Sequence, residues 1–182
     1  MQTLETNRLV LRAPRLSDAS ATQRLLPHWT VVKYLATVPW PYPDDGATTY
    51  LSETVLPGIA NGTILAWVIT VRELGDELAG FVDIHAHTDR PTWGSRGFWL
   101  GEEFWNAGYM TEALEAVNRH VFGELGIESF EARNAVANTA SSRLKANGVA
   151  RYIETIIDDC LCGPVPTEVW QVHRDDWLAA HP

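Results

Sequence analysis

The sequence contains no apolar run that approaches the roughly 20 residues that a membrane-spanning helix requires. Its N-terminus, MQTLETNRLVLR, also lacks the apolar core of a secretory signal peptide. Positive charge is scarce, because 14 Lys and Arg residues stand against 23 Asp and Glu residues and leave a formal net charge of −9. This imbalance argues against nucleic acid or an anionic membrane as the main partner, and it slightly favours amine-bearing ligands.

Cysteine is scarce as well. The two cysteines, Cys160 and Cys162, are one residue apart, which is too close for a disulfide framework, and no set of His or Cys around them completes a zinc site. We therefore expect free thiols, no bound metal and a cytoplasmic protein. The sequence also has neither Gly-x-Gly-x-x-Gly nor Gly-Lys-Ser/Thr, so the common nucleotide-binding loops are excluded.

Strand-like and helix-like patterns alternate along the 182 residues without repeats, low-complexity segments or linkers. Because the strands come in runs, we expect one α/β (α+β) domain, residues 1–182, with a mixed rather than doubly wound sheet. Strands are expected in 8–14, 64–73, 77–87, 95–101 and 128–135, with a closing hairpin of 150–159 and 167–178. Helices are expected in 17–29 (with Ser17 as the N-cap), in 45–61, in the stretch after Gly108 and in 138–147.

The stretch WLGEEFWNAGYMTEALEAVNRHVFGELG, residues 99–126, predicts a strand end, a short loop and an amphipathic helix. Gly108 lacks a Cβ and lets the backbone approach a ligand closely. The N–H groups of Tyr109, Met110 and Thr111 would be unpaired at the helix N-terminus and would suit a phosphate. A simpler alternative is that Gly108 only permits a tight strand-to-helix turn.

Four blocks of the sequence resemble the GNAT N-acetyltransferases, and within them the ribosomal-protein N-terminal acetyltransferase (RimJ/RimL-type) branch. In chain order the blocks are ETNRLVLRAPRLSDA, GFWLGEEFWNAGYMTEAL, FEARNAVANTASSRL and VWQVHRDDW. The resemblance spans nearly the whole chain. It implies a GNAT fold, in which a mixed sheet is splayed at the acetyl-CoA site and flanked by helices. It also implies direct transfer of an acetyl group from acetyl-CoA to a primary amine in a ternary complex.

The resemblance further implies a set of coenzyme A contacts. Trp105 takes the first position of the pyrophosphate loop, Gly108 its invariant glycine and Met110 its last position, while Asn106 replaces a second glycine. The strand end would pair its backbone with the pantetheine arm, and Asn138 would contact the arm with Ser141 beside it, although helix capping also explains these two residues. The full set comprises Trp99, Leu100, Trp105, Asn106, Ala107, Gly108, Tyr109, Met110, Thr111, Asn138 and Ser141.

The catalytic acid and base are less clearly marked. Many family members have a glutamate at the position of Ser95 and a tyrosine at the position of Lys145. These two departures favour a rival interpretation, in which the chain is a non-catalytic acyl-CoA-binding or regulatory module.

Other residues provide substitutes for the missing acid and base. Asp83, His85 and His87 alternate along one strand and so share a face, and a histidine is well suited to accept a proton near neutral pH. Glu103 could act through a water, and Ser141 could donate to the thiolate. The alternative for the first three is a solvent-facing polar edge.

Aromatic side chains concentrate before residue 46, where this branch forms its acceptor cleft. With nearby acidic residues they would suit an ammonium-bearing acceptor, either a protein N-terminus or a small-molecule amine. Packing in the core or in a loop explains any single aromatic equally well. Nucleic acid and membranes are not expected partners, and a homodimer stays open. The residues concerned are His28, Trp29, Tyr34, Trp40 and Tyr42, with Asp44 and Asp45.

Overall fold

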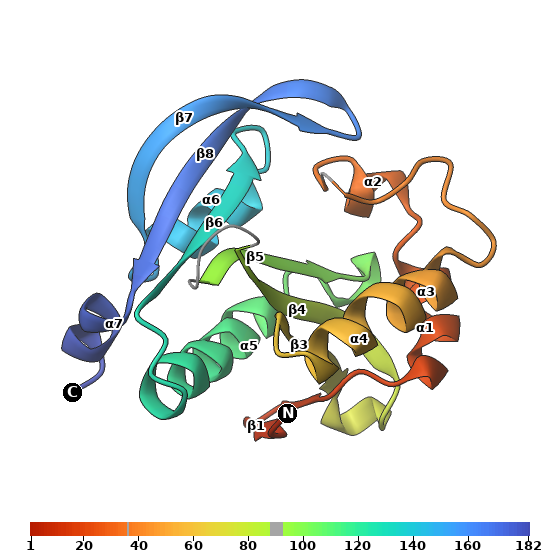
Figure 1. The fold of residues 1–182 in the computed structure, drawn as a ribbon, viewed down its shortest axis with the longest axis horizontal. Coiled ribbons are helices and arrows are strands. Elements are labelled where there is room, and N and C mark those ends of the chain that lie inside the picture. The colour runs from red at the N-terminus through yellow and green to blue at the C-terminus, as the bar shows by residue number, and fades with distance from the viewer. Residues whose placement is uncertain (36, 88–92) are drawn as a thin grey trace.

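The computed structural model describes residues 1–35, 37–87 and 93–182; residue 36, in the segment expected to form the acceptor cleft, lies outside the described residues. The described strands form one eight-stranded sheet with the order β1-β2-β3-β4-β5-β6-β8-β7 (Figure 1). The strands are β1 (Leu4–Glu5), β2 (Leu9–Arg12), β3 (Ile64–Val71), β4 (Leu78–Ala86), β5 (Trp93–Leu100), β6 (Ser129–Ala135), β7 (Arg151–Cys160) and β8 (Gly163–His173).

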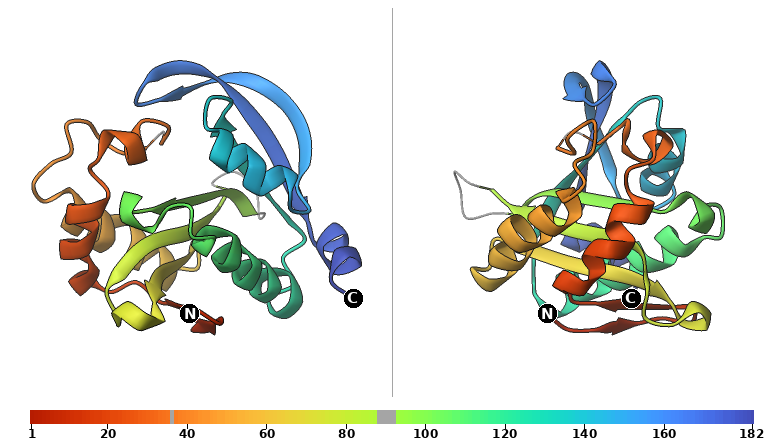
Figure 2. Two further views of the ribbon diagram at one scale, coloured as in Figure 1. Left: turned by 180° about the vertical axis from the view of Figure 1, so that it is seen from behind. Right: turned by 90° about the vertical axis from the view of Figure 1, so that its right-hand side faces the viewer.

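Helices cover both faces of this sheet (Figure 2). They are α1 (Ala19–Leu25), α2 (Trp29–Val32), α3 (Gly46–Thr49), α4 (Leu56–Ala60), α5 (Tyr109–Asn118), α6 (Thr139–Ala146) and α7 (Arg174–Ala180). A π-helical stretch, Tyr50–Val55, joins α3 to α4, and another, Arg119–Glu124, extends α5. In the described ranges, none of the helices is both long and apolar enough to cross a bilayer.

The two faces follow from the alternation of side chains along the strands. On β3, Trp67 points into the core formed with α5, whereas Ala66 and Val68 pack into a second core formed with α1, the π-helical stretch Tyr50–Val55 and α4. The predicted strands and helices are confirmed in outline, including the helix expected over 45–61. The expected mixed sheet is confirmed as well.

The sheet parts between β5 and β6. All the other neighbouring strands pair antiparallel, but β5 and β6 are parallel and share a single register pair, Ser95 with Glu131. Beyond this pair the C-terminal end of β5 has β4 on one side and none of the described strands on the other. The splay expected from the sequence is therefore present, and it leaves backbone groups of β5 without a partner strand.

The tip of the β7–β8 hairpin contacts the segment that follows α2. The N–H groups of Leu161 and Cys162 donate to the carbonyls of Leu35 and Lys33, at distances of 3.3 and 3.2 Å. Figure 1 shows the hairpin arching over toward α2. Segments that are more than 120 residues apart in the sequence therefore meet above the splayed edge.

Two local predictions were wrong. The segment 174–178, expected within the closing strand, forms α7, because Trp177 packs 6.1 Å from the ring of Phe122 and the Arg174 guanidinium donates to the Phe122 carbonyl. Ser17 does not cap the first helix. Instead, the Asp18 carboxylate accepts the Arg15 N–H at 2.7 Å.

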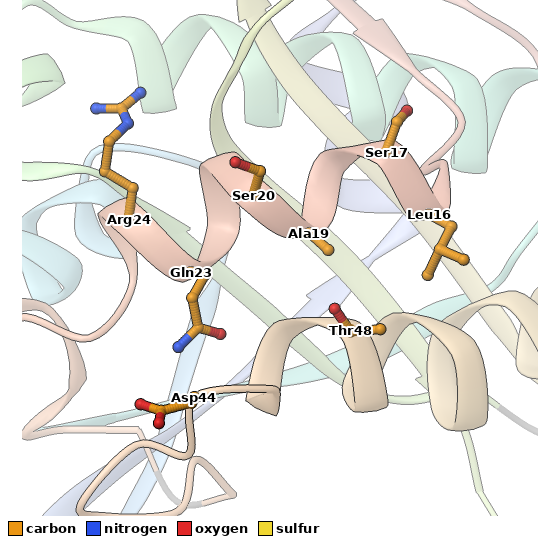
Figure 3. Close-up of a pocket in the computed structure, with 8 residues that line it drawn as sticks. All are labelled: Leu16, Ser17, Ala19, Ser20, Gln23, Arg24, Asp44 and Thr48. Atoms are coloured by element: carbon orange, nitrogen blue, oxygen red, sulfur yellow. The ribbon is translucent and has the colours of Figure 1, made fainter.

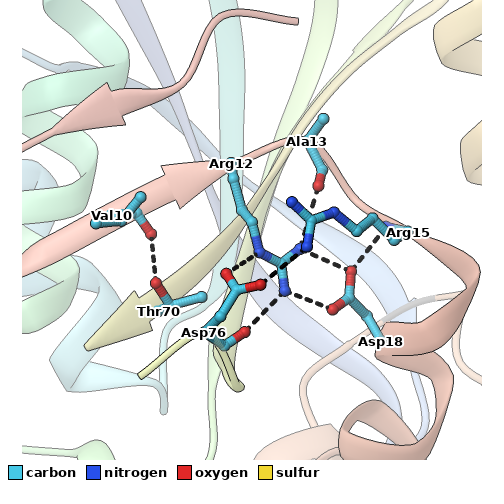
Figure 4. A network of polar contacts seen from close by, with 7 residues as sticks. All are labelled: Val10, Arg12, Ala13, Arg15, Asp18, Thr70 and Asp76. Carbon is cyan, nitrogen blue, oxygen red and sulfur yellow. Dashed lines mark hydrogen bonds and ion pairs between the residues drawn. The ribbon is translucent and has the colours of Figure 1, made fainter. Parts of the chain in front are cut away.

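Asp18 also belongs to a buried ion pair that fixes the entrance to α1 (Figure 4). The Arg12 guanidinium donates to both Asp18 carboxylate oxygens, at 2.7 and 3.0 Å, and the two side chains are only 7% and 5% exposed. This hydrogen bonding raises the pKa of Arg12, although burial opposes the shift. The partly exposed Asp76 completes the arginine's contacts.

Removal of this arginine gives a stability prediction. Arg12→Leu should lower the free energy of unfolding by about 3–5 kcal/mol, because it leaves the Asp18 carboxylate buried without its cation. The matched control is Arg15→Leu, whose ion pair with Asp76 is exposed on both sides and should be worth less than about 1 kcal/mol. Chemical denaturation of both variants measures the difference, and equal losses would contradict a structural role for the buried pair.

Candidate active site

The loop before α5 contains two residues in the left-handed backbone conformation. Gly108, the N-cap of α5, has φ = +79°, and Asn106 has φ = +60°. Asparagine is one of the few residues that tolerate this left-handed region, which explains how Asn106 takes the place of a loop glycine. The first N–H groups of α5, which begins at Tyr109, have no acceptor within the helix.

Arg8, between β1 and β2, holds this loop from below. Its guanidinium donates to the Ala107 carbonyl at 2.8 Å, pairs with Glu112 at 2.7 Å and lies 4.8 Å from the centre of the Tyr109 ring. Burial tends to raise the pKa of Glu112, but hydrogen bonds from Thr6 and Arg8 outweigh burial and leave this pKa lowered. The negative charge in the first turn of α5 is therefore neutralised locally rather than left to repel an anion.

The open edge of β5 begins next to this loop. The Gly101 N–H donates to the Ala79 carbonyl, so the backbone groups of Trp99 face β4, while those of Phe98 and Leu100 face the gap beside β6. The Trp105 indole donates to the Leu100 carbonyl at 2.9 Å, as this orientation requires. The backbone of Trp99 therefore faces β4 rather than the gap, and the predicted pairing of the Leu100 backbone with a ligand stays a prediction.

A carboxylate and an imidazole lie in contact on one face of β4. This face is covered by α3, the π-helical stretch Tyr50–Val55 and α4, which together form one continuous helix over residues 46–60. Asp83 Oδ2 lies 3.3 Å from His85 Nε2 and accepts a hydrogen bond from the Tyr50 hydroxyl at 3.3 Å. The predicted common face of Asp83 and His85 is confirmed by this contact. The hydrogen bond to Asp83 raises the pKa of His85 against the effect of burial, and burial beside Asp83 raises the pKa of Tyr50.

The remaining catalytic candidates on this side are less well placed. His87 lies beside Gly94, since a Cβ added to Gly94 would be 3.1 Å from Nδ1 of His87. The Glu103 side chain is 57% exposed and pairs with Arg24 at 3.5 Å. Within the described part of the chain Glu103 has no hydrogen bond to Asp83, His85 or Ser141, so the structure gives it no support as a base. Ser95, at the family's glutamate position, is exposed.

The other side of the gap is formed by β6 and α6. The side-chain oxygen of Asn138, Oδ1, accepts a hydrogen bond from the Ser141 N–H at 3.3 Å. Asn138 therefore caps α6, as the capping alternative predicted. The Ser141 hydroxyl is buried and accepts a hydrogen bond from Lys145 Nζ at 2.7 Å. A ligand contact by Asn138 or Ser141 stays a prediction.

The aromatic residues expected at an acceptor cleft lie on and after α2. The Trp29 and Trp40 rings are 5.4 Å apart, and each side chain is nearly half exposed. Tyr42 interacts electrostatically with Tyr50, whose hydroxyl donates to Asp83. Because both tryptophans are exposed to this extent, the alternative that they pack in the core does not apply to them.

A groove beside α1 is a separate feature. It has a volume of about 610 Å³ and lies between α1 and α3, as Figure 3 shows. Of the predicted site residues, only Asp44 lines it. The remaining lining residues are Leu16, Ser17, Ala19, Ser20, Gln23, Arg24 and Thr48. This groove therefore does not extend the arrangement around β5.

The structure thus combines a parted mixed sheet, a loop with two left-handed residues at the start of α5, and a contact between Asp83 and His85 on β4, the strand next to β5. The chain matches the Acetyltransferase (GNAT) domain over residues 8–147, and it belongs to this family. Family membership makes it an acetyltransferase, as the sequence predicted.

Individual relatives agree with this assignment. An uncharacterized N-acetyltransferase, p20, of Bacillus licheniformis is 28% identical over 147 residues, which is 79% of each chain. A RimL ribosomal L7/L12 alpha-N-protein acetyltransferase, solved in complex with coenzyme A, has a TM-score of 0.81 and 19% identity over 96% of this chain and 99% of that chain. A ribosomal-protein-S5-alanine acetyltransferase from Vibrio fischeri has a TM-score of 0.82 and 14% identity over 97% and 99%.

Sequence reasoning missed three residues that the structure brings to the site: Arg8, Tyr50 and Asn134. Arg8 stood in a block that carried the family resemblance, yet nothing in the sequence placed it under the loop before α5. Tyr50 is 33 residues from Asp83, and its position depends on how the helix 46–60 packs on the sheet. Asn134 looked like an ordinary strand residue, but its side chain accepts a hydrogen bond from Lys145.

Proposed function

We propose that this chain transfers the acetyl group of acetyl-CoA to a primary amine, directly and within a ternary complex. The observation that carries the proposal is the loop Trp105–Gly108 with its two left-handed residues at the start of α5, beside the unpaired edge of β5. The complex of the RimL relative with coenzyme A supports this donor.

The residues around the gap fit coenzyme A. The amides from Asn106 to Thr111 would hold the pyrophosphate, since unpaired helix N-terminal N–H groups bind phosphate oxygens well. The Leu100 N–H and the backbone groups of Phe98 would satisfy the amide-bearing arm, and one of these N–H groups would polarise the thioester carbonyl. When bound, acetyl-CoA supplies the activated acetyl group, and the protein supplies position and proton transfer.

His85 would take the proton of the acceptor amine, directly or through one water. Asp83 accepts from the His85 ring and so favours the imidazolium that forms, while the Tyr50 hydroxyl fixes the other side of the same carboxylate oxygen. On this proposal His85 would serve as the base even though Ser95 stands where the family's glutamate is common. This contact is the reason for preferring catalysis over a purely regulatory module.

The acceptor would approach from α2, past Trp29 and Trp40. An alkylammonium group is attracted to aromatic faces and to the negative charge of the chain. The two ribosomal-protein acetyltransferases with the same fold support a protein N-terminus as acceptor. A small-molecule amine fits the same chemistry, and a panel containing both classes separates them.

Coenzyme A and acetyl-CoA should each raise the melting temperature. At a ligand concentration about 100 times the Kd, binding adds about 2.7 kcal/mol, which for a chain of this size is roughly 5–10 °C. Thermal denaturation with and without ligand measures the shift. No shift at millimolar ligand would overturn the donor assignment, whereas a shift without acetylation of any amine in the panel would favour a regulatory module.

A further inference from the structure

Lys145 is an unusual lysine in this chain. It is one of only two, the other being Lys33, and its residue is 2% exposed. Its Nζ donates to Ser141 Oγ and to Asn134 Oδ1, both at 2.7 Å. A lysine is almost never this buried without a paired charge, and neither of these partners is charged.

The charges around the amine do not compensate for its burial. Arg96, fully buried on β5, disfavours the ammonium form, and Glu168 on β8 favours it without contacting it directly. The Glu168 carboxylate instead accepts hydrogen bonds from Ser142, Asn134 and Trp170. Burial and Arg96 together lower the pKa of Lys145 to about 7.

The position of Nζ matters as much as its protonation. It contacts Asn134 on β6 and lies 5.5 Å from the centre of the Phe98 ring on β5, so it sits between the two strands where the sheet parts. Phe98 and Leu100 turn their backbone groups into the same gap. The amine is held there by Ser141, whose N–H is bound by Asn138 at the start of α6.

We propose that Lys145, acting through the Ser141 hydroxyl, supplies the proton that the sulfur of coenzyme A takes up when the acetyl group leaves. Ser141 is the residue that would meet the sulfur, and Lys145 is a positioning residue and the proton source behind it. The proposal rests on the proposed function, because it presumes that the thioester lies in the β5–β6 gap.

The step balances as follows. A carbon–nitrogen bond forms between the acceptor amine and the acetyl carbon, and the carbon–sulfur bond breaks with its electron pair passing to sulfur. The Ser141 hydroxyl proton moves to sulfur and gives a thiol, while a proton from the Lys145 ammonium restores the hydroxyl. Lys145 is left neutral and regains a proton from solvent, and the proton lost by the amine leaves through His85.

Removal of the amine should slow acetyl transfer about tenfold. The effect is modest for a proton donor, because an ordinary thiol has a pKa of only about 8.5 and its thiolate is already a fair leaving group. We expect this loss in the single-turnover rate of Lys145→Met, while Lys145→Arg keeps the charge but cannot release a proton and should be equally slow. The control is Arg143→Met, an exposed cation on the same helix, which should keep the wild-type rate.

The pH profile separates a proton donor from a merely structural residue. In the wild type the rate should fall as pH rises above about 7, because Lys145 loses its proton there. This alkaline decline should disappear in both Lys145 variants and persist in Arg143→Met. A decline that survives in folded Lys145→Met and Lys145→Arg would overturn the proposal.

A second readout does not depend on activity. Protein labelled with ¹³C at the lysine side chain gives only two lysine signals, and Lys33→Arg identifies the one from Lys145. The pH at which the Lys145 signal is half titrated should change when coenzyme A is added. It should stay constant when only the nucleotide half of coenzyme A is added, because that half lacks the sulfur. An unchanged midpoint with bound coenzyme A would refute the role of Lys145 alone, whereas absence of any binding would refute the proposed function itself.

Discussion

His85→Ala is expected to lower kcat about a hundredfold or more, the usual scale for loss of a general base. The alanine variant removes the imidazole that contacts Asp83, and water must then accept the amine proton unaided. Coenzyme A affinity should be nearly unchanged, since His85 lies on β4 and the loop before α5 is formed by other residues. Steady-state kinetics with an amine found by screening, together with a coenzyme A titration, measures both quantities.

The pH dependence of kcat/KM tests whether His85 acts as the base. His85 must be neutral to accept a proton, and its hydrogen bond to Asp83 raises the pKa above the ordinary value of about 6.5. The acidic limb of kcat/KM should therefore lie above pH 6.5, with activity rising as pH passes through it. Asp83→Asn should move the limb toward lower pH, because a neutral amide favours the imidazolium far less than a carboxylate does.

His87→Ala is the matched control and should have a smaller effect, since His87 stands at the end of the strand by Gly94. Near-wild-type kcat in His85→Ala would show that the histidine belongs to a polar strand face. Catalysis would then rest on positioning of the reactants and on the N–H groups at the end of β5.

Gly108→Val is expected to weaken coenzyme A binding at least tenfold. A β-branched residue is strained at φ = +79°, by about 1–3 kcal/mol, and it escapes the strain by turning the loop out of the shape that presents its amides. An added Cβ would be 3.4 Å from the Arg8 guanidinium, which is an ordinary contact. The backbone conformation, rather than crowding in the free protein, therefore decides the outcome.

Asn106→Gly is the control for the loop. Glycine adopts φ = +60° without strain, so this variant should bind coenzyme A about as well as the wild type. Isothermal titration of both variants, with melting curves to establish that they are folded, makes the comparison. Wild-type affinity in a folded Gly108→Val protein would refute the assignment of the loop to the pyrophosphate.

The sequence was most informative where a local pattern decides the structure. Alternation predicted β3 and β4, and the glycine before an amphipathic helix predicted the turn into α5, because both depend on nearby residues. The segment 174–178 was misjudged for the opposite reason. Its helix depends on Trp177 finding Phe122, a contact across more than 50 residues that no local pattern contains.

The site was predictable in part for the same physical reason. Asp83 and His85 share a strand face by simple alternation, so their contact could be expected. The partner of Asp83 on the neighbouring helix, Tyr50, could not. Lys145 was noticed only as a departure from a tyrosine, and its burial beside Ser141 became visible only when α6 was placed against β5 and β6.

The parting of β5 from β6 has a consequence for unfolding. Backbone hydrogen bonding divides the sheet into two ladders, β1–β5 and β6–β8–β7, which share one register pair. Regions joined by so few shared hydrogen bonds tend to open as separate cooperative units. An arm that hydrogen-bonds in the gap would fuse the two ladders, so coenzyme A would make amide protons exchange together on both sides of its site.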